Sequence, residues 1–274
     1  MCKMASFWHN PINGDIAVYD LTSHSSTQKH LKLNERVWRE GHYLPSGEIE
    51  CRLCDCDRIE PHEANERLRN RFPTFKEFLQ WALTQNIGGS FDLSGCDLTG
   101  LTLPSTINGW LGMSHCNLTG LTLPSTINGW LCLSHCVLTG VTLPSTVGGS
   151  LYLNGCDLTG ITLPSTVGGT LYLRGCDSAG ITLPSTVGGR LDLSGCDLAG
   201  ITLPSTVSGS LDLSGCDLTG ITLPSTVSGS LYLNGCDLTG ITLPSTVGGC
   251  INLRGNEPGC EEAMKQYKKI RSLA

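Results

Sequence analysis

Leucines alternate with polar residues in short runs that recur every 20 positions through the middle of the chain. Residues 91–250 contain eight copies of one 20-residue unit, seen clearly at 211–230 as LDLSGCDLTGITLPSTVSGS. The Leu-x-Leu alternation is typical of a short strand, and the glycines and prolines after it indicate turns. One unit cannot bury its own apolar side chains, whereas stacked units can. The pattern predicts a β-solenoid of eight coils, with a ninth that begins at Ile251.

Stacking would align each repeat position into a ladder along the solenoid. We expect the cysteine ladder to be small, buried and inert rather than a redox or metal array, because thiols in apolar surroundings react poorly. Proline lacks a backbone N–H, so the ladder from Pro104 to Pro244 predicts irregular structure on its side and a regular sheet on the Leu-x-Leu side. The cysteine ladder comprises Cys96, Cys116, Cys136, Cys156, Cys176, Cys196, Cys216 and Cys236.

The unit resembles a leucine-rich repeat. The family pattern is L-x-L-x-x-(N/C)-x-L, often followed by L-T-G-x-(I/L)-P-x-x-(L/V). One difference is that the apolar residue before the strand, Val207, stands four positions ahead of it rather than three, and residues 221–222 add length. The resemblance implies a solenoid whose strands form one exposed sheet. The positions that match are Leu211, Leu213, Cys216, Leu218, Pro224 and Val227.

A four-sided pentapeptide-repeat β-helix, which also has 20 residues per coil, is the alternative. Residues 216–220 (CDLTG) are similar to that family's A-(D/N)-L-x-x block, whereas residues 226–230 (TVSGS) do not fit it. This second resemblance implies an acidic DNA mimic that inhibits a nucleic-acid-binding protein such as DNA gyrase, a topoisomerase. Both solenoids stay open at this point, and the leucine-rich form is favoured.

The two ends of the chain do not share the repeat. Residues 1–87 predict a small α+β domain, with a strand at 16–21, a hairpin over 40–53 that turns at Pro45–Gly47, and a helix from His62 to Arg71. Thr74 and Glu77 form a capping-box pattern that opens a helix to about Gln85, which should cover the first coil. Residues 88–255 are the repeat solenoid, and residues 256–274 should form a helical cap at its other end.

Positions beside the buried leucines point outward, and they vary between copies while the scaffold does not. Aromatic and arginine side chains in register have the composition of a protein-binding surface. The leading hypothesis is therefore a non-enzymatic scaffold or inhibitor that engages another protein through this sheet. The expected contact residues are Trp110, Trp130, Tyr152, Tyr172, Arg174, Arg190, Asp192, Asp212 and Tyr232.

Charge is low and unevenly distributed. The chain has 274 residues, of which 15% are charged, and a net charge of −6. Residues 88–256 hold nine Asp and three Arg, with no Glu or Lys. Such a surface repels nucleic acid and suits a basic partner, as a DNA mimic would, but an Asp after a strand also commonly caps a turn. Six of these residues share one ladder: Asp97, Asp157, Asp177, Asp197, Asp217 and Asp237.

The only metal-like cluster is Cys51, Cys54 and Cys56 with His62 or His42. It could bind zinc, although a second Cys-x-x-Cys pair is missing and reduced thiols are the simpler interpretation. No other cofactor is expected. His115 and His135 lie one repeat apart, but no third ligand accompanies them.

Catalytic motifs of the G-x-S-x-G, P-loop or HExxH type do not occur, so we expect no enzyme activity from the repeats. A small effector or toxin within residues 1–87 stays open, with His24, His30 and His42 as candidates. Neither a signal-peptide core nor an apolar run long enough for a membrane helix is present. We therefore expect a cytoplasmic protein with reduced cysteines and no membrane contact, while export by another route stays open. A bacterial or phage inhibitor is compatible with these expectations.

Overall fold

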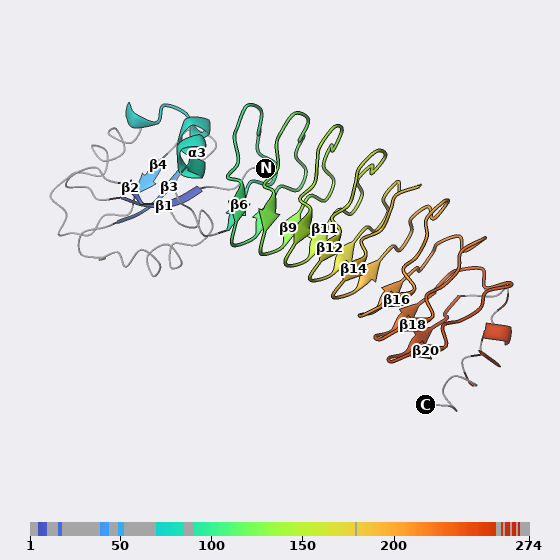
Figure 1. Cartoon of the computed structure of the whole chain (residues 1–274). Coiled ribbons are helices and arrows are strands. Elements are labelled where there is room, and N and C mark those ends of the chain that lie inside the picture. The colour runs from blue at the N-terminus through green and yellow to red at the C-terminus, as the bar shows by residue number, and fades with distance from the viewer. Residues whose placement is uncertain are drawn as a thin grey trace.

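A parallel β-solenoid of about eight coils forms the larger part of the molecule (Figure 1). Its strands occupy the inner side of an arc, and the loops fan apart on the outer side. The predicted solenoid is thus confirmed. The computed structural model describes residues 70–84, 90–178, 180–255, 259, 261–263, 265, 266 and 268, and the backbone of residues 5–9, 16–17, 39–43 and 49–51.

Nine parallel strands, one from each coil and each only two residues long, build the main sheet. They pair in sequence order with a shift of 20 residues, so that Leu111 lies opposite Leu131 and Leu131 opposite Leu151. Identical register in every coil keeps each leucine above the next. The strands are β5 (Phe91–Asp92), β7 (Leu111–Gly112), β9 (Leu131–Cys132), β11 (Leu151–Tyr152), β13 (Leu171–Tyr172), β15 (Leu191–Asp192), β17 (Leu211–Asp212), β19 (Leu231–Tyr232) and β21 (Ile251–Asn252).

A second set of two-residue strands follows the proline ladder. It forms a five-stranded sheet from β6 to β14 and a three-stranded sheet from β16 to β20. The proline side is therefore less regular than the main sheet, as predicted, but it is not devoid of pairing. These strands are β6 (Thr106–Ile107), β8 (Thr126–Ile127), β10 (Thr146–Val147), β12 (Thr166–Val167), β14 (Thr186–Val187), β16 (Thr206–Val207), β18 (Thr226–Val227) and β20 (Thr246–Val247).

The core lies inside the coils, behind the strands, and consists of the same few positions in each coil. In the coil at 151–170, Leu151, Leu153 and Leu158 are fully buried, and Val167 from the second sheet meets them. Fully burying one such side chain stabilises the fold by about 1.5–3 kcal/mol, and the ladder repeats that contribution in every coil.

The cysteine ladder is buried and hydrogen-bonded. The Cys156 thiol donates to the Leu133 carbonyl at 3.1 Å, and the Cys176 thiol donates to the Leu153 carbonyl at 3.0 Å. Burial raises the pKa of the Cys176 thiol to about 12. The ladder from Cys116 to Cys236 is therefore buried packing in which each thiol also satisfies a carbonyl of the preceding coil. Cys96, at the start of the ladder, is disulfide-bonded, which corrects the prediction that all the cysteines are reduced.

Helix α3 (Phe75–Thr84) covers the first coil. It begins with the predicted capping box, in which the Glu77 amide donates to the Thr74 hydroxyl at 3.2 Å and the Thr74 amide donates to the Glu77 carboxylate at 2.9 Å. Its apolar face, including Phe78 and Leu79, is fully buried. The Gln80 side chain accepts a hydrogen bond from the Thr102 amide at 2.9 Å, which anchors the helix to the first loop.

The described residues between 261 and 268 are helical and close the opposite end. Ala263 is buried, and the Gln266 side chain accepts from the Leu243 amide at 2.9 Å and donates to the Ile241 carbonyl at 3.2 Å. A glutamine thus ties each cap to the loop that precedes the proline ladder, at adjacent rather than identical repeat positions.

A four-stranded antiparallel sheet precedes the solenoid, in the order β2–β1–β3–β4. The predicted hairpin is present as β3 (Arg39–Tyr43) and β4 (Ile49–Cys51), and the predicted strand at 16–21 is described as β2 (Ile16–Ala17). Strand β1 (Ala5–His9) was not predicted. Within the described part of the chain, no helix has the length and apolar character to cross a bilayer.

Candidate interaction surface

The outward side chains of the main sheet form what we call the concave face. It comprises positions 90, 92 and 94 and their equivalents every 20 residues, on the inner side of the arc in Figure 1. The leucines between these positions point into the core and are buried. All nine expected contact residues therefore lie on one continuous surface.

Four aromatic rings from successive coils contact one another on the concave face. The Trp110 and Trp130 rings stack with centroids 4.3 Å apart and planes inclined by 5°. Trp130 then meets Tyr152 edge to face at 6.0 Å, and Tyr152 stacks on Tyr172 at 4.6 Å. We call these four residues the aromatic ladder. All four are half-buried, so each ring keeps an exposed part.

The ladder is continuous although its tryptophans and tyrosines occupy different repeat positions. A Cβ atom placed on Gly112 would lie 3.3 Å from the Trp110 ring, so the indole leans over the position that carries tyrosine in later coils. The next coil has the small Cys132 there, whose Sγ lies 3.0 Å from Ser114 Oγ. Both coils that carry tryptophan, at 110 and 130, thus have a small residue two positions later.

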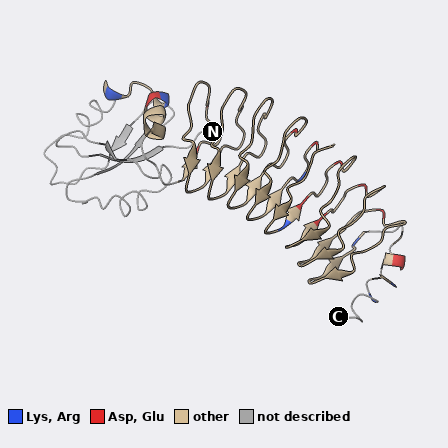
Figure 2. Ribbon diagram, viewed as in Figure 1, with Lys and Arg blue, Asp and Glu red and all other residues tan. Residues whose placement is uncertain are grey.

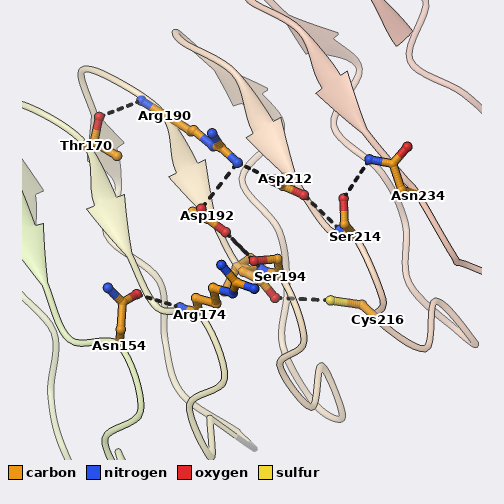
Figure 3. Close-up of polar contacts among 11 residues, drawn as sticks. Asn154, Thr170, Arg174, Arg190, Asp192, Ser194, Asp212, Ser214, Cys216 and Asn234 are labelled. Carbon is orange, nitrogen blue, oxygen red and sulfur yellow. Dashed lines mark hydrogen bonds and ion pairs between the residues drawn. The ribbon is translucent and has the colours of Figure 1, made fainter. Parts of the chain in front are cut away.

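An ionic cluster follows the aromatic ladder (Figure 3). The Arg190 guanidinium lies 3.3 Å from Asp192 and also pairs with Asp212 on the next strand. Their carboxylates are only 10% and 11% exposed, and their other oxygens accept hydrogen bonds from the Ser194 and Ser214 amides. The two aspartates are thus held within the protein and are not open to a partner as free charges.

Two further residues complete this end of the concave face. The Arg190 guanidinium also lies 5.2 Å from the centroid of the Tyr232 ring, a cation–π contact. Arg174 is exposed, and its backbone amide donates to the Asn154 side chain at 3.0 Å. Arg190 therefore ties the last aromatic ring to the cluster, while Arg174 remains accessible.

The charges of the solenoid separate into two groups. The concave face carries three aspartates and three arginines, which sum to zero, and most of the ribbon is uncharged in Figure 2. The other six aspartates form the exposed ladder just after the strands. The whole net charge of −6 between residues 88 and 256 therefore lies off the concave face.

The acidic ladder forms local turns. Asp157 accepts a hydrogen bond from the Thr159 amide at 2.9 Å, and Asp217 accepts one from Thr219 at 2.9 Å. Hydrogen bonds from the threonine hydroxyl and amide lower the pKa of both carboxyls. The predicted turn role is confirmed, and the carboxylates still face solvent.

His115 and His135 form a second stacked pair, with centroids 4.9 Å apart and planes inclined by 10°. Both adopt positive φ, of 59° and 58°, at a position that is glycine in the other described coils. The sequence indicates this unusual backbone conformation, because a histidine replaces the glycine that the repeat has at this position. Parallel rings do not aim their nitrogen lone pairs at one point, and the described residues contain no group of three or more metal-ligating side chains.

Two surface cavities lie on the loop side, away from the concave face. The larger, of about 450 Å³, lies between the loops at 120–125 and 140–145, and the other, of about 380 Å³, lies one coil further on. Glycine, threonine, leucine, proline and serine line both, and Val141 adds to the second. These cavities are gaps between loops that fan apart, and their lining has no titratable side chain to support chemistry.

The remaining candidates of the sequence lie outside the described residues. One set is the candidate zinc cluster of Cys51, Cys54, Cys56 and His62, with His42 as the alternative ligand; only the backbone at 42 and 51 is described. The other set is the candidate effector residues His24 and His30.

Comparisons with known proteins give no family: no family model matches the chain, and no curated protein matches it.

Proposed function

We propose that the chain is a non-enzymatic scaffold or inhibitor that binds a partner protein on its concave face. The observation that carries this proposal is the placement of sequence variation. The buried positions repeat almost unchanged, whereas the outward positions at 90, 92 and 94 and their equivalents change between aromatic, charged and small residues from coil to coil. Half-buried aromatic rings in contact, beside exposed Arg174, have the composition of an interface centre.

The form of the coils favours a leucine-rich-repeat relationship over a pentapeptide-repeat one. A four-sided pentapeptide coil would give four similar faces and a straight axis. Here one side is a nine-stranded sheet, the opposite side is loops, and the axis bends toward the sheet (Figure 1). The asymmetry supports a binding surface on the strand side.

The test begins with capture of partners on the full chain, followed by measurement of binding to each purified partner. The double variant W110A/W130A should weaken the complex at least about tenfold, because interface aromatics are common hot spots. The matched control T122A/T142A changes exposed loop residues of the same coils and should bind normally. Equal affinity of both variants for every captured protein would overturn the proposal.

Acidic mimicry of DNA is the second candidate, since the exposed ladder carries the entire net charge of the solenoid. Substituting Asp157, Asp177, Asp197 and Asp217 by Asn removes the charges and keeps an oxygen that can accept the turn hydrogen bond. If mimicry operates, the wild-type chain inhibits a supercoiling assay with DNA gyrase and the fourfold variant does not. No inhibition by the wild-type chain at high excess would remove this candidate.

A further inference from the structure

The tips and edges of the aromatic ladder indicate which kind of partner segment it fits. We propose that the ladder binds an uncharged, proline-rich segment in the polyproline II conformation, lying along the solenoid axis. The proposal rests on the scaffold function above and specifies the partner's chemistry.

The rings offer edges and hydrogen-bond donors rather than open faces. Stacking within the Trp110–Trp130 pair and the Tyr152–Tyr172 pair covers one face of every ring. Within the described part of the protein, the indole N–H groups of the tryptophans and the hydroxyls of the tyrosines make no hydrogen bond. A sugar chain, which packs on open ring faces, is therefore a poor match, and a ligand rich in hydrogen-bond acceptors is a good one.

A polyproline II segment supplies such acceptors. Its carbonyls are not used within the helix, and proline has no N–H of its own to satisfy. The carbonyls of an α-helix, in contrast, are already bonded along the helix. Four donor tips in a row can thus pair with a polyproline II chain but not with an α-helix.

The spacing of the ladder also agrees with polyproline II. Three residues of that helix advance about 9.3 Å, and two coils of a solenoid advance about 9.6 Å. The three successive ring spacings of 4.3, 6.0 and 4.6 Å average about one coil. Every third proline residue would therefore meet every second ring. A β-strand, whose side chains on one face repeat at about 6.7 Å, falls out of step after one coil.

Charge favours the same occupant. The three aspartates and three arginines of the concave face sum to zero, and the Asp192 and Asp212 carboxylates are largely buried and share Arg190 as their ion-pair partner. A neutral aromatic surface suits an uncharged segment, and aromatic-lined surfaces are a recurrent way to recognise proline-rich chains. Binding should consequently depend little on salt.

The experiment uses the full chain and fluorescein-labelled decaproline, with binding followed by fluorescence anisotropy. We expect saturable binding that changes less than about twofold between low salt and about 0.5 M salt. The variant Y152F/Y172F keeps both rings and removes only the hydroxyls, so its folding is not in question. Two lost hydrogen bonds should weaken binding about tenfold. W110A/W130A should weaken it further, and T122A/T142A should have no effect.

Failure to bind decaproline would overturn the proposal, as would equal binding by wild type and W110A/W130A. An amphipathic helical peptide and a Gly/Ser peptide of equal length serve as competitors, and displacement by the helical peptide alone would assign the ladder to a helix. If a purified partner requires Trp110 and Trp130 while decaproline neither binds nor competes, this inference fails and the scaffold function stands.

Discussion

Removing Arg190 should destabilise the protein, because the two aspartates beside it would then repel each other without a cation between them. Asp192 and Asp212 lie on adjacent strands, with side chains only 10% and 11% exposed, and Arg190 pairs with both. Carboxylates one strand spacing apart repel by about 3 kcal/mol at the effective dielectric of a protein surface. Partial rotation toward solvent relieves some of this repulsion, so R190S should lower the free energy of unfolding by about 2 kcal/mol.

The repeat itself provides the matched control. Serine occupies the position of Arg190 in several other coils, and Tyr152, Tyr172 and Tyr232 occupy the position of the aspartates. The triple variant R190S/D192Y/D212Y therefore restores the common coil and removes all three charges. Its free energy of unfolding should lie within about 1 kcal/mol of the wild-type value, because aromatic pairs across adjacent strands are themselves favourable.

Urea unfolding at neutral pH, followed by far-ultraviolet circular dichroism, measures all three proteins. About 1 M sodium chloride should return part of the stability to R190S, since salt screens the repulsion, and should change the triple variant little. The reasoning is wrong if R190S matches wild type, or if the triple variant is as unstable as R190S.

Three further predictions concern the scaffold. Deletion of residues 211–230 joins identical sequence and should give a shorter solenoid that still unfolds cooperatively by circular dichroism, whereas a ten-residue deletion from the same start should not fold. Gly155→Ala should lower the free energy of unfolding in urea more than Gly175→Ala does. Both glycines have positive φ, but only a Cβ atom at 155 would meet the His135 ring, at 2.5 Å. In an H135G background the two substitutions should therefore cost the same. Folding raises the pKa of the Cys176 thiol from an ordinary 9.0 to about 12, so the unfolded chain releases this proton first. The free energy of unfolding should therefore fall by about 1.4 kcal/mol per pH unit from this thiol as pH rises between these values. If C176A shows the same dependence of stability on pH as wild type, this prediction is wrong.

The sequence predicted the solenoid and its caps because those features depend on patterns that one chain displays. Eight copies in register define the buried leucines, and Thr74 with Glu77 defines the start of α3. The second set of strands escaped prediction, because two residues such as Thr146–Val147 are too short to show a period. Their pairing comes from stacking of coils, which local pattern does not reveal.

The candidate surface was predicted as a set of positions but not as a set of contacts. Alignment of the repeats places Trp130 and Tyr152 in different columns, yet their rings meet edge to face with centroids 6.0 Å apart. Arg190 and Asp192 were both expected to contact a partner, whereas the structure pairs them with each other. This pairing could have been predicted from the sequence, because a shift of 20 residues places Asp192 beside Asp212 and both near Arg190.

The fold itself separates the positions that must stay constant from those that are open to change. A Cβ atom on Gly149 would lie 2.7 Å from the backbone carbon of Gly129 and 2.8 Å from the Trp130 nitrogen, so every coil needs glycine at that position. The very next position, at 130 or 150, faces the concave side and accepts serine, threonine, arginine, cysteine or tryptophan. Because the scaffold tolerates serine there, it does not require the tryptophans for stacking of coils. Their presence in two adjacent coils, where Trp130 also meets Tyr152, is therefore not needed for folding and is in keeping with the proposed role of the concave face.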